Sequence, residues 1–241
     1  MISLKGIYGG YGSLDILSDF GIEVAKGTLN CIVGPNGAGK STVLKAISGI
    51  LTPRAGSIEI DGNELVGLSP AQILKAGIVQ VPQRNGLFAG LTVKQNVMMG
   101  GYVARRDRRR LDSRYEELSG MFPLITARAS ERAGSLSGGQ RRIVEFARAM
   151  MLTPSVVLLD EPTLGLDPKS RGVVFDATKA MNAAGVTILM VEQNVRFGLS
   201  LADRMTVMSA GTVVLTGTAQ EIADHPDLMG LFFGTASELS V

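Results

Sequence analysis

Eight consecutive residues in the first fifth of the chain have the types and spacing that bind the phosphates of a nucleotide. They follow the pattern G-x-x-x-x-G-K-S, come after an apolar run at residues 29–33 and precede helically spaced residues at 42–47. A strand, a glycine-rich loop and a helix in this order form a phosphate-binding loop, whose backbone N–H groups face a polyphosphate. We therefore predict that a nucleoside triphosphate is bound by Gly34, Pro35, Asn36, Gly37, Ala38, Gly39, Lys40, Ser41 and Thr42.

Two side chains at the end of this loop add specific chemistry. Lys40 supplies a mobile cation for the β- and γ-phosphates, and the hydroxyl of Ser41 can ligate Mg²⁺. A glycine-rich turn followed by a chance Lys-Ser pair is the alternative, which the flanking strand and helix disfavour.

Two carboxylates stand where a second buried strand ends. Residues 156–159 are apolar, and Asp160 and Glu161 follow them directly. We predict that Asp160 holds Mg²⁺ next to Ser41, directly or through a water molecule. Glu161 is then placed to orient or deprotonate the water that attacks the γ-phosphate. The alternative is a solvated acidic turn.

A glycine pair at the start of a predicted helix indicates close approach of another group. Each glycine costs about 1 kcal/mol relative to alanine within a helix. A helix N-terminus with a serine hydroxyl suits an anion, although a plain glycine-rich helix cap is the alternative. The stretch, called the signature stretch below, is Leu136, Ser137, Gly138, Gly139 and Gln140.

The elements around these residues predict an α/β fold. Short apolar strands, antiparallel in the first part of the chain with a turn at residues 9–12, give way after residue 84 to helical patterns, including a helix at 112–121. Continuous apolar runs at 156–159 and 186–191 are typical of parallel strands that are covered on both faces. A capping box at Thr218 predicts the last helix.

We interpret this order as a P-loop NTPase, with a RecA-like core that carries an antiparallel β subdomain and an inserted α-helical subdomain. The predicted α/β core comprises residues 1–83 and 155–217, the helical subdomain residues 84–154, and a short helical tail residues 218–241.

Composition and net charge indicate the cellular compartment and the classes of partner. The 241 residues include one cysteine, Cys31, and carry a net charge of +2. We therefore expect a reducing compartment and no nucleic-acid partner. No apolar run reaches the roughly 18 residues that cross a bilayer, and the first residues lack the plan of a secretory signal. We expect a soluble, cytoplasmic chain that reaches a membrane only through a partner.

The motifs, together with Gly165-Leu166-Asp167-Pro168, occur in the order found in ABC-transporter ATPase subunits, which this chain resembles over essentially its whole length. The resemblance implies that two such subunits pair head to tail. Each ATP then lies between the phosphate loop of one subunit and Ser137, Gly138 and Gly139 of the other. Asp167 would couple the two sites across the interface.

The resemblance also assigns roles outside the main motifs. Tyr11 matches the aromatic residue that stacks on adenine; Tyr8 and simple local packing of Tyr11 are the alternatives. Gln83 matches the glutamine that reaches Mg²⁺ and the attacking water. The family usually places a histidine where this chain has Gln193, and an amide can donate to phosphate but cannot become cationic. The one histidine, His225, is expected in a surface turn.

Residues 191–194, 201–204 and 231–234 resemble the branched-chain amino-acid importer subgroup. The resemblance implies ATP hydrolysis at the cytoplasmic face of the inner membrane, a second ATPase subunit that is identical or a sister chain, transmembrane permease subunits and an extracytoplasmic solute-binding protein. A permease groove is expected near residues 87–99, which could also be ordinary core. Rival interpretations are an exporter ATPase of the lipopolysaccharide type, a soluble ABC ATPase of cofactor assembly and a non-hydrolysing nucleotide sensor.

Residues 105–110 contain five arginines. Such runs are usually solvated helix faces, and attraction to anionic lipid headgroups is the alternative.

Overall fold

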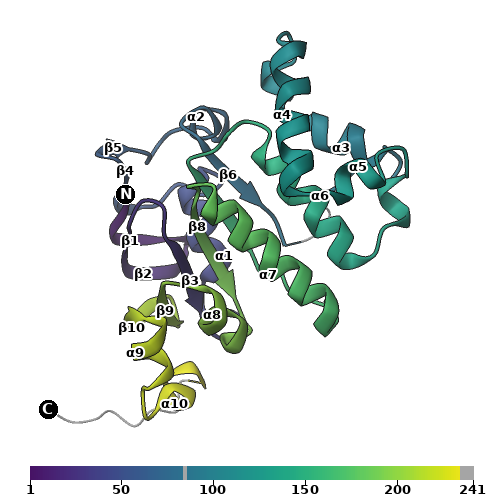
Figure 1. The fold of residues 1–241 in the computed structure, drawn as a ribbon. Helices are drawn as coiled ribbons and strands as arrows, with labels where there is room; N and C mark the ends of the chain where they lie inside the picture. Colours follow the sequence, from purple (N-terminus) through teal and green to yellow (C-terminus); the bar gives the residue numbers. More distant parts are fainter. Residues whose placement is uncertain (84–85, 234–241) are drawn as a thin grey trace, which may run out of the picture. The chain divides into compact units, whose positions relative to one another are not determined.

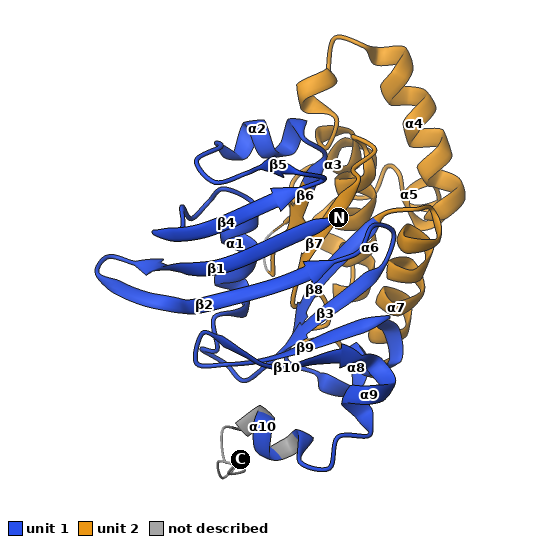
Figure 2. Ribbon diagram, turned by 90° about the vertical axis from the view of Figure 1, so that its left-hand side faces the viewer, with its two compact units in different colours: residues 1–78, 187–241 blue, residues 79–186 orange. Residues whose placement is uncertain are grey.

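The computed structural model describes residues 1–83 and 86–233. The chain forms two compact units: unit 1 comprises residues 1–78 and 187–241, and unit 2 comprises residues 79–186 (Figure 2). The α/β fold is confirmed. The subdomain boundaries predicted from the sequence stay a prediction, and residues 84–85 and 234–241 of those segments lie outside the described residues.

Strands and helices both occur in the first and last parts of the chain, whereas the middle is mainly helical (Figure 1). Unit 1 contains β1 (Ile2–Tyr11), β2 (Leu14–Val24), β3 (Leu29–Val33), α1 (Lys40–Ile47), β4 (Ala55–Ile60), β5 (Asn63–Glu64), α2 (Pro70–Lys75), β8 (Thr187–Glu192), α8 (Val195–Leu201), β9 (Arg204–Ser209), β10 (Thr212–Thr218), α9 (Ala219–Ala223) and α10 (Leu228–Phe233). β6 (Ile78–Val81) starts at the unit boundary. Unit 2 contains α3 (Val93–Met99), η1 (Tyr102–Ala104), α4 (Arg108–Met121), α5 (Leu124–Ala127), η2 (Ala133–Ser135), α6 (Gly138–Met150), β7 (Val156–Asp160) and α7 (Pro168–Ala183).

The first sheet of unit 1 is antiparallel and has the strand order β2-β1-β4-β5 (Figure 2). Ile2 lies opposite Val24 on one side and Ile60 on the other. The antiparallel prediction is confirmed, but β1 and β2 are 10 and 11 residues long rather than short. The turn predicted at residues 9–12 starts later, at Gly12, because Gly10 and Tyr11 still pair with β2.

The second sheet of unit 1 surrounds the strand that leads into the phosphate loop. Its strands run in the order β10-β9-β3-β8, and β3 pairs in parallel with both β8 and β9. Every residue of β3 is buried, as expected for a parallel strand with neighbours on both edges and layers on both faces. The helix α1 packs against β8 and β2. The loop after β3 therefore starts from a rigid support.

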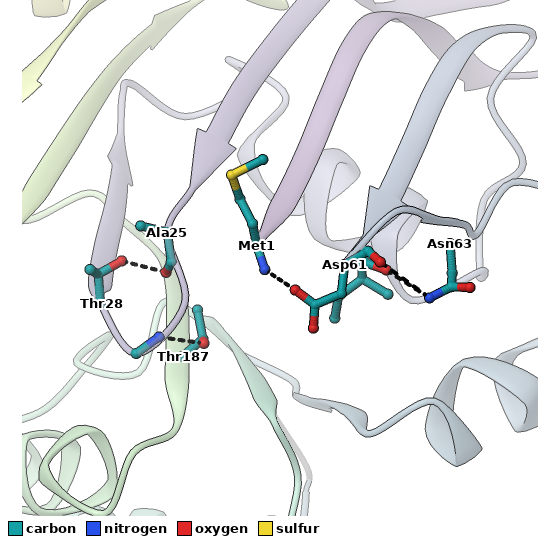
Figure 3. Close-up of polar contacts among 8 residues, drawn as sticks. Met1, Ala25, Thr28, Asp61, Asn63 and Thr187 are labelled. Atoms are coloured by element: carbon teal, nitrogen blue, oxygen red, sulfur yellow. Dashed lines mark hydrogen bonds and ion pairs between the residues drawn. The ribbon is translucent and has the colours of Figure 1, made fainter.

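Polar contacts fix the turns at one edge of unit 1 (Figure 3). The backbone N–H of Gly27 donates to the Thr187 hydroxyl at 2.9 Å, and the Thr28 hydroxyl donates to the Ala25 carbonyl at 2.7 Å. These bonds hold the entry to β3 beside the start of β8. Nearby, the terminal ammonium of Met1 pairs with Asp61 and holds the pKa of that exposed carboxyl below its usual range.

Unit 2 is built around α6, which packs against α3, α5 and α7. Phe146, Val144 and Ala147 of this helix are fully buried. The helix predicted at residues 112–121 begins earlier, at Arg108, because the Asp107 side chain accepts a hydrogen bond from the Arg110 N–H at 3.1 Å and caps it. In unit 2, β6 and β7 are neighbouring strands.

None of the helices in the described part of the chain is long and apolar enough to cross a membrane. The helix capped by Thr218 is α9, as predicted, but it is not the last one, because α10 follows it.

The burial of β2 gives a direct test of this fold. Leu17 is fully buried and Leu14, on the same strand, is 64% exposed. Leu17→Ala should lower the free energy of unfolding by about 2–5 kcal/mol through lost contacts and a cavity. Leu14→Ala, the matched control, should change it by less than about 0.5 kcal/mol. Urea unfolding measures both, and equal effects would contradict this placement of β2.

Candidate functional site

The phosphate loop, residues 34–41, connects β3 to α1 with a backbone that only small residues allow. Gly39 is the N-cap of α1 and has φ +100°, a left-handed conformation that side chains disfavour. A Cβ on Gly34 would lie 2.2 Å from the carbonyl oxygen of Met208 in β9. The glycines therefore let the loop pass directly over the sheet. The loop ends at the N-terminus of α1, where the first N–H groups of that helix lie.

Lys40 holds the loop together from inside. Its Nζ donates to the carbonyls of Gly34 at 2.8 Å and Pro35 at 2.9 Å, and the residue is buried. A buried ammonium next to helix N-terminal amides gives this loop a positive potential, which suits an anion. Ser41 and Thr42 follow in the first turn of α1.

The loop is also supported from the neighbouring elements of unit 1. The N–H of Gly211, in the β9–β10 turn, donates to the Ala38 carbonyl at 3.0 Å. The N–H of Ser18 in β2 donates to the Gly211 carbonyl at 3.2 Å. Both sheets of unit 1 are thus hydrogen-bonded, through this turn, to the phosphate loop.

Gln193 lies at the same sheet edge as the loop. The parallel register places Glu192 beside Val33, the residue before Gly34, and Gln193 is the next residue and is exposed. Sequence reasoning missed Glu192, which is buried. Burial and this carboxylate raise the pKa of the Cys31 thiol, while Lys40 opposes them. Cys31 is therefore an unreactive structural thiol.

Tyr11 stands at the end of β1 and contacts the helix that follows the loop. Its hydroxyl accepts a hydrogen bond from Lys45 Nζ at 2.9 Å, and the ring is half exposed, at 50%. An exposed aromatic ring offers a face for stacking, and the role of Tyr11 toward adenine stays a prediction.

His225 lies between α9 and α10, where its Nδ1 accepts a hydrogen bond from the Asp227 N–H at 3.2 Å, as expected for a turn residue.

The second group of predicted residues lies in unit 2. Asp160 is the last residue of β7 and is buried, and Glu161 follows it with φ +42°. This left-handed conformation costs a glutamate about 1–3 kcal/mol and is characteristic of functional sites. The Nε2 of Gln83 donates to Glu161 Oε2 at 2.6 Å. Sequence reasoning singled out both residues, and the structure brings them together.

The signature stretch forms the N-terminus of α6 as predicted. Ser137 is the N-cap, and it forms a reciprocal capping box with Gln140. The two glycines have a packing reason within unit 2, because a Cβ on Gly138 would lie 2.7 Å from Leu166 and one on Gly139 2.9 Å from Ser170. An anion-binding role for Ser137 and these glycines stays a prediction.

Asp167 caps α7. Its carboxylate accepts hydrogen bonds from the Ser170 N–H at 3.0 Å and the Ser170 hydroxyl at 2.6 Å. These bonds hold the pKa of Asp167 below its usual range.

Sequence reasoning missed a buried ion pair on α6, between Arg142 and Glu145. The signal was present in the sequence: two opposite charges three residues apart stand on the apolar side of a helix, among Ile143, Val144 and Phe146. An open cleft of about 350 Å³ adjoins this pair. Its lining includes Gln83, Gly86, Leu87, Ala89, Gly134, Gly138 and Leu166.

The predicted site residues therefore form two groups. The phosphate loop, Tyr11 and Gln193 belong to unit 1. Gln83, the signature stretch, Asp160, Glu161 and Asp167 belong to unit 2.

Comparison with known proteins agrees with this geometry. The model of the ABC transporter family matches residues 17–164. The chain is 36% identical to the high-affinity branched-chain amino acid transport ATP-binding protein BraG of Pseudomonas aeruginosa, over 97% of this chain and 100% of that protein. It is also 36% identical to a probable branched-chain amino acid transport ATP-binding protein, LivF, of Archaeoglobus fulgidus, over 97% of this chain and 99% of that protein.

A solved structure has the same fold. It is the ADP conformation of an ATP-binding cassette of an ABC transporter, with a TM-score of 0.87 and 25% identity. The match covers 97% of this chain and 98% of that one.

The close approach at Gly34 predicts a selective loss of nucleotide binding. Gly34→Ala places a methyl group against the Met208 carbonyl and must move the loop, so ATP affinity should fall at least tenfold, equivalent to about 1.4 kcal/mol. Gly90→Ala, whose Cβ would meet nothing within 4 Å, is the control. Equilibrium titration with a fluorescent ATP analogue measures both, and unchanged affinity in Gly34→Ala would contradict this loop geometry.

Proposed function

The chain belongs to the ABC transporter family, and from this premise we propose that it is the ATP-binding and hydrolysing subunit of an importer for branched-chain amino acids or similar small solutes. The solute class is proposed from the match over the full length of BraG, whose name states that it serves branched-chain amino acid transport. The phosphate loop and the Gln83–Glu161 pair support the ATPase part of the proposal.

ATP binding rests on unit 1. The loop amides and Lys40 hold the phosphates, and the ring of Tyr11 stacks on adenine. Gln193, in the place of the family histidine, donates a hydrogen bond to the γ-phosphate and brings no titratable proton.

The oxygen donors of the predicted metal residues fit Mg²⁺. The described residues contain no cluster of three His, Cys, Asp or Glu side chains that could hold a metal ion by themselves. Nucleotide-bound Mg²⁺ needs none, because one or two carboxylates, together with substrate phosphates and water, are sufficient to hold it. Asp160 would supply the carboxylate, and Ser41 and Gln83 would add a hydroxyl and an amide oxygen. Mg²⁺ held there would neutralise charge on the β- and γ-phosphates.

Hydrolysis rests on Glu161. Its carboxylate accepts the proton of the attacking water, and the Gln83 amide fixes the carboxylate orientation through the 2.6 Å hydrogen bond. The left-handed backbone of Glu161 sets the direction of its Cα–Cβ bond, and the hydrogen bond from Gln83 orients the carboxylate, which reduces reorganisation during the reaction.

The proposal includes partners. A second ATPase subunit, identical or a sister chain, pairs head to tail so that Ser137, Gly138 and Gly139 complete the partner's ATP site and Asp167 couples the two sites. Transmembrane permease subunits bind the cleft beside Leu87 and Ala89, where the Phe88 side chain is exposed. An extracytoplasmic solute-binding protein delivers the solute. The chain thus lies peripherally on the cytoplasmic face of the inner membrane.

The variant Glu161→Gln tests this proposal. Loss of the general base should slow ATP hydrolysis about 10²- to 10⁴-fold while ATP binding is kept. A tagged Glu161→Gln chain, isolated from membranes with ATP and Mg²⁺, should therefore retain its partners in the closed state, which mass spectrometry identifies.

Recovery of a multi-span permease with a solute-binding protein supports the importer, and a permease without one points to an exporter. Recovery of only soluble partners would overturn the transporter proposal in favour of a soluble ATPase. Glu116→Gln, an exposed glutamate of α4, is the control and should hydrolyse ATP at the wild-type rate.

Gln193 gives an independent test through pH. Gln193→His introduces a group with an ordinary pKa of about 6.5 beside the γ-phosphate. The ratio of variant to wild-type kcat should therefore change between about pH 6 and pH 8, as the imidazole loses its proton. Steady-state ATPase assays measure this ratio, and a constant ratio would remove any phosphate-sensing role from this position.

A further inference from the structure

The helix α6 buries two opposite charges that none of the proposed catalytic steps uses. Arg142 Nη1 lies 2.7 Å from Glu145 Oε2, and the two side chains are only 8% and 7% exposed. Burying a charge is unfavourable unless its partner and further hydrogen bonds compensate for lost water. The remaining donors of the Arg142 guanidinium therefore need acceptors, and the acceptors they have indicate its role.

Those acceptors are two consecutive backbone carbonyls just after β6. Arg142 Nη1 donates to the Pro82 carbonyl at 2.9 Å, and Nη2 donates to the Gln83 carbonyl. The planar guanidinium fork thus holds the backbone on which the Gln83 side chain is mounted. That side chain donates to Glu161.

Glu145 is enclosed from a second direction. A Cβ on Gly86 would lie 2.4 Å from Glu145 Oε1, so the backbone at residue 86 passes directly over the carboxylate. The ion pair therefore contacts the chain at residues 82 and 83 through Arg142, and at residue 86 through Glu145.

We propose that Arg142 is a positioning residue for ATP hydrolysis. Glu145 fixes the guanidinium, the guanidinium fixes the backbone of Gln83, and the Gln83 amide orients the Glu161 carboxylate. This inference rests on the proposed role of Glu161 as general base. Because Arg142 stands in the first turns of α6, it also connects the helix that begins at Gly138 to the Gln83–Glu161 pair.

If Arg142 had only a structural role, loss of its hydrogen bonds to the Pro82 and Gln83 carbonyls would lower the stability of unit 2. Turnover by the folded protein would then be unchanged. The chain contains a matched control for this alternative. Arg114 donates to the Met150 carbonyl from Nε at 3.1 Å and Nη2 at 3.0 Å, and it pairs with Glu117 at 2.8 Å. Like Arg142, it pairs with a glutamate and donates to the backbone, but its pair is more exposed and its backbone hydrogen bonds go to Met150 alone rather than to Pro82 and Gln83.

The test uses Arg142→Lys in the complex isolated from membranes. Lysine keeps the positive charge beside Glu145 but lacks the planar fork that reaches two carbonyls at once. Misplacement of a catalytic group by about 1 Å can cost about 10²-fold, so kcat should fall 10- to 100-fold with KM for ATP within about twofold of wild type. Arg114→Lys should leave kcat and KM unchanged even where it lowers Tm.

A double-mutant cycle with Gln83→Ala separates positioning from general damage. If Arg142 acts through Gln83, then Arg142→Lys should cause no further loss of kcat in the Gln83→Ala background. Multiplication of the two losses, or wild-type kcat in Arg142→Lys, would overturn the proposal. Should Arg142→Lys fail to fold, the charge-neutral Arg142→Gln/Glu145→Gln pair takes its place in the same cycle, with the same expected and contradicting results.

Glu161→Gln, measured beside these variants, keeps the two proposals apart. Full hydrolysis by Glu161→Gln would refute the proposed base, and the positioning proposal with it. An inactive Glu161→Gln together with multiplicative losses would refute only the role of Arg142.

Discussion

The buried ammonium of Lys40 is the interaction on which the rest of unit 1 depends. It is held by two carbonyls of the loop in which it stands, Gly34 and Pro35. A buried cation is stable only with such acceptors, and these two hydrogen bonds fix the conformation of the loop. The parallel strands on both sides of β3 and the turn at Gly211 then hold this loop at one sheet edge.

In unit 2, the residue that hydrogen-bonds its neighbours into place is Gln83 rather than a lysine. There, the strained backbone of Glu161 and the buried charge of Arg142 both need support from the surrounding chain. The hydrogen bond from Gln83 joins these two features. The same few residues after β6 thus accept hydrogen bonds from α6 and donate one to the end of β7. A shift of either element would therefore displace the other through these hydrogen bonds.

The sequence predicted the local elements around the candidate site better than the lengths of the early strands. The phosphate loop, the capped helices α6 and α9 and the buried strands depend on local spacing, which a sequence displays. Gly10 and Tyr11 were assigned to a turn because glycines favour turns, but pairing with β2 overrides that preference. Arg142 and Glu145 were missed because charged residues are usually exposed. Their spacing on the apolar side of α6 indicated that they face the core, and tertiary packing adds which backbone groups they contact.

The measurement that tests the central claim most directly is solute uptake by the isolated membrane complex in proteoliposomes. Radiolabelled leucine is supplied on the face opposite to this chain, and ATP with Mg²⁺ on the face that this chain occupies. The account predicts leucine uptake that requires ATP and stops when a non-hydrolysable analogue replaces it. Hydrolysis of ATP without movement of leucine or another small branched-chain solute, or movement in the opposite direction, would contradict it.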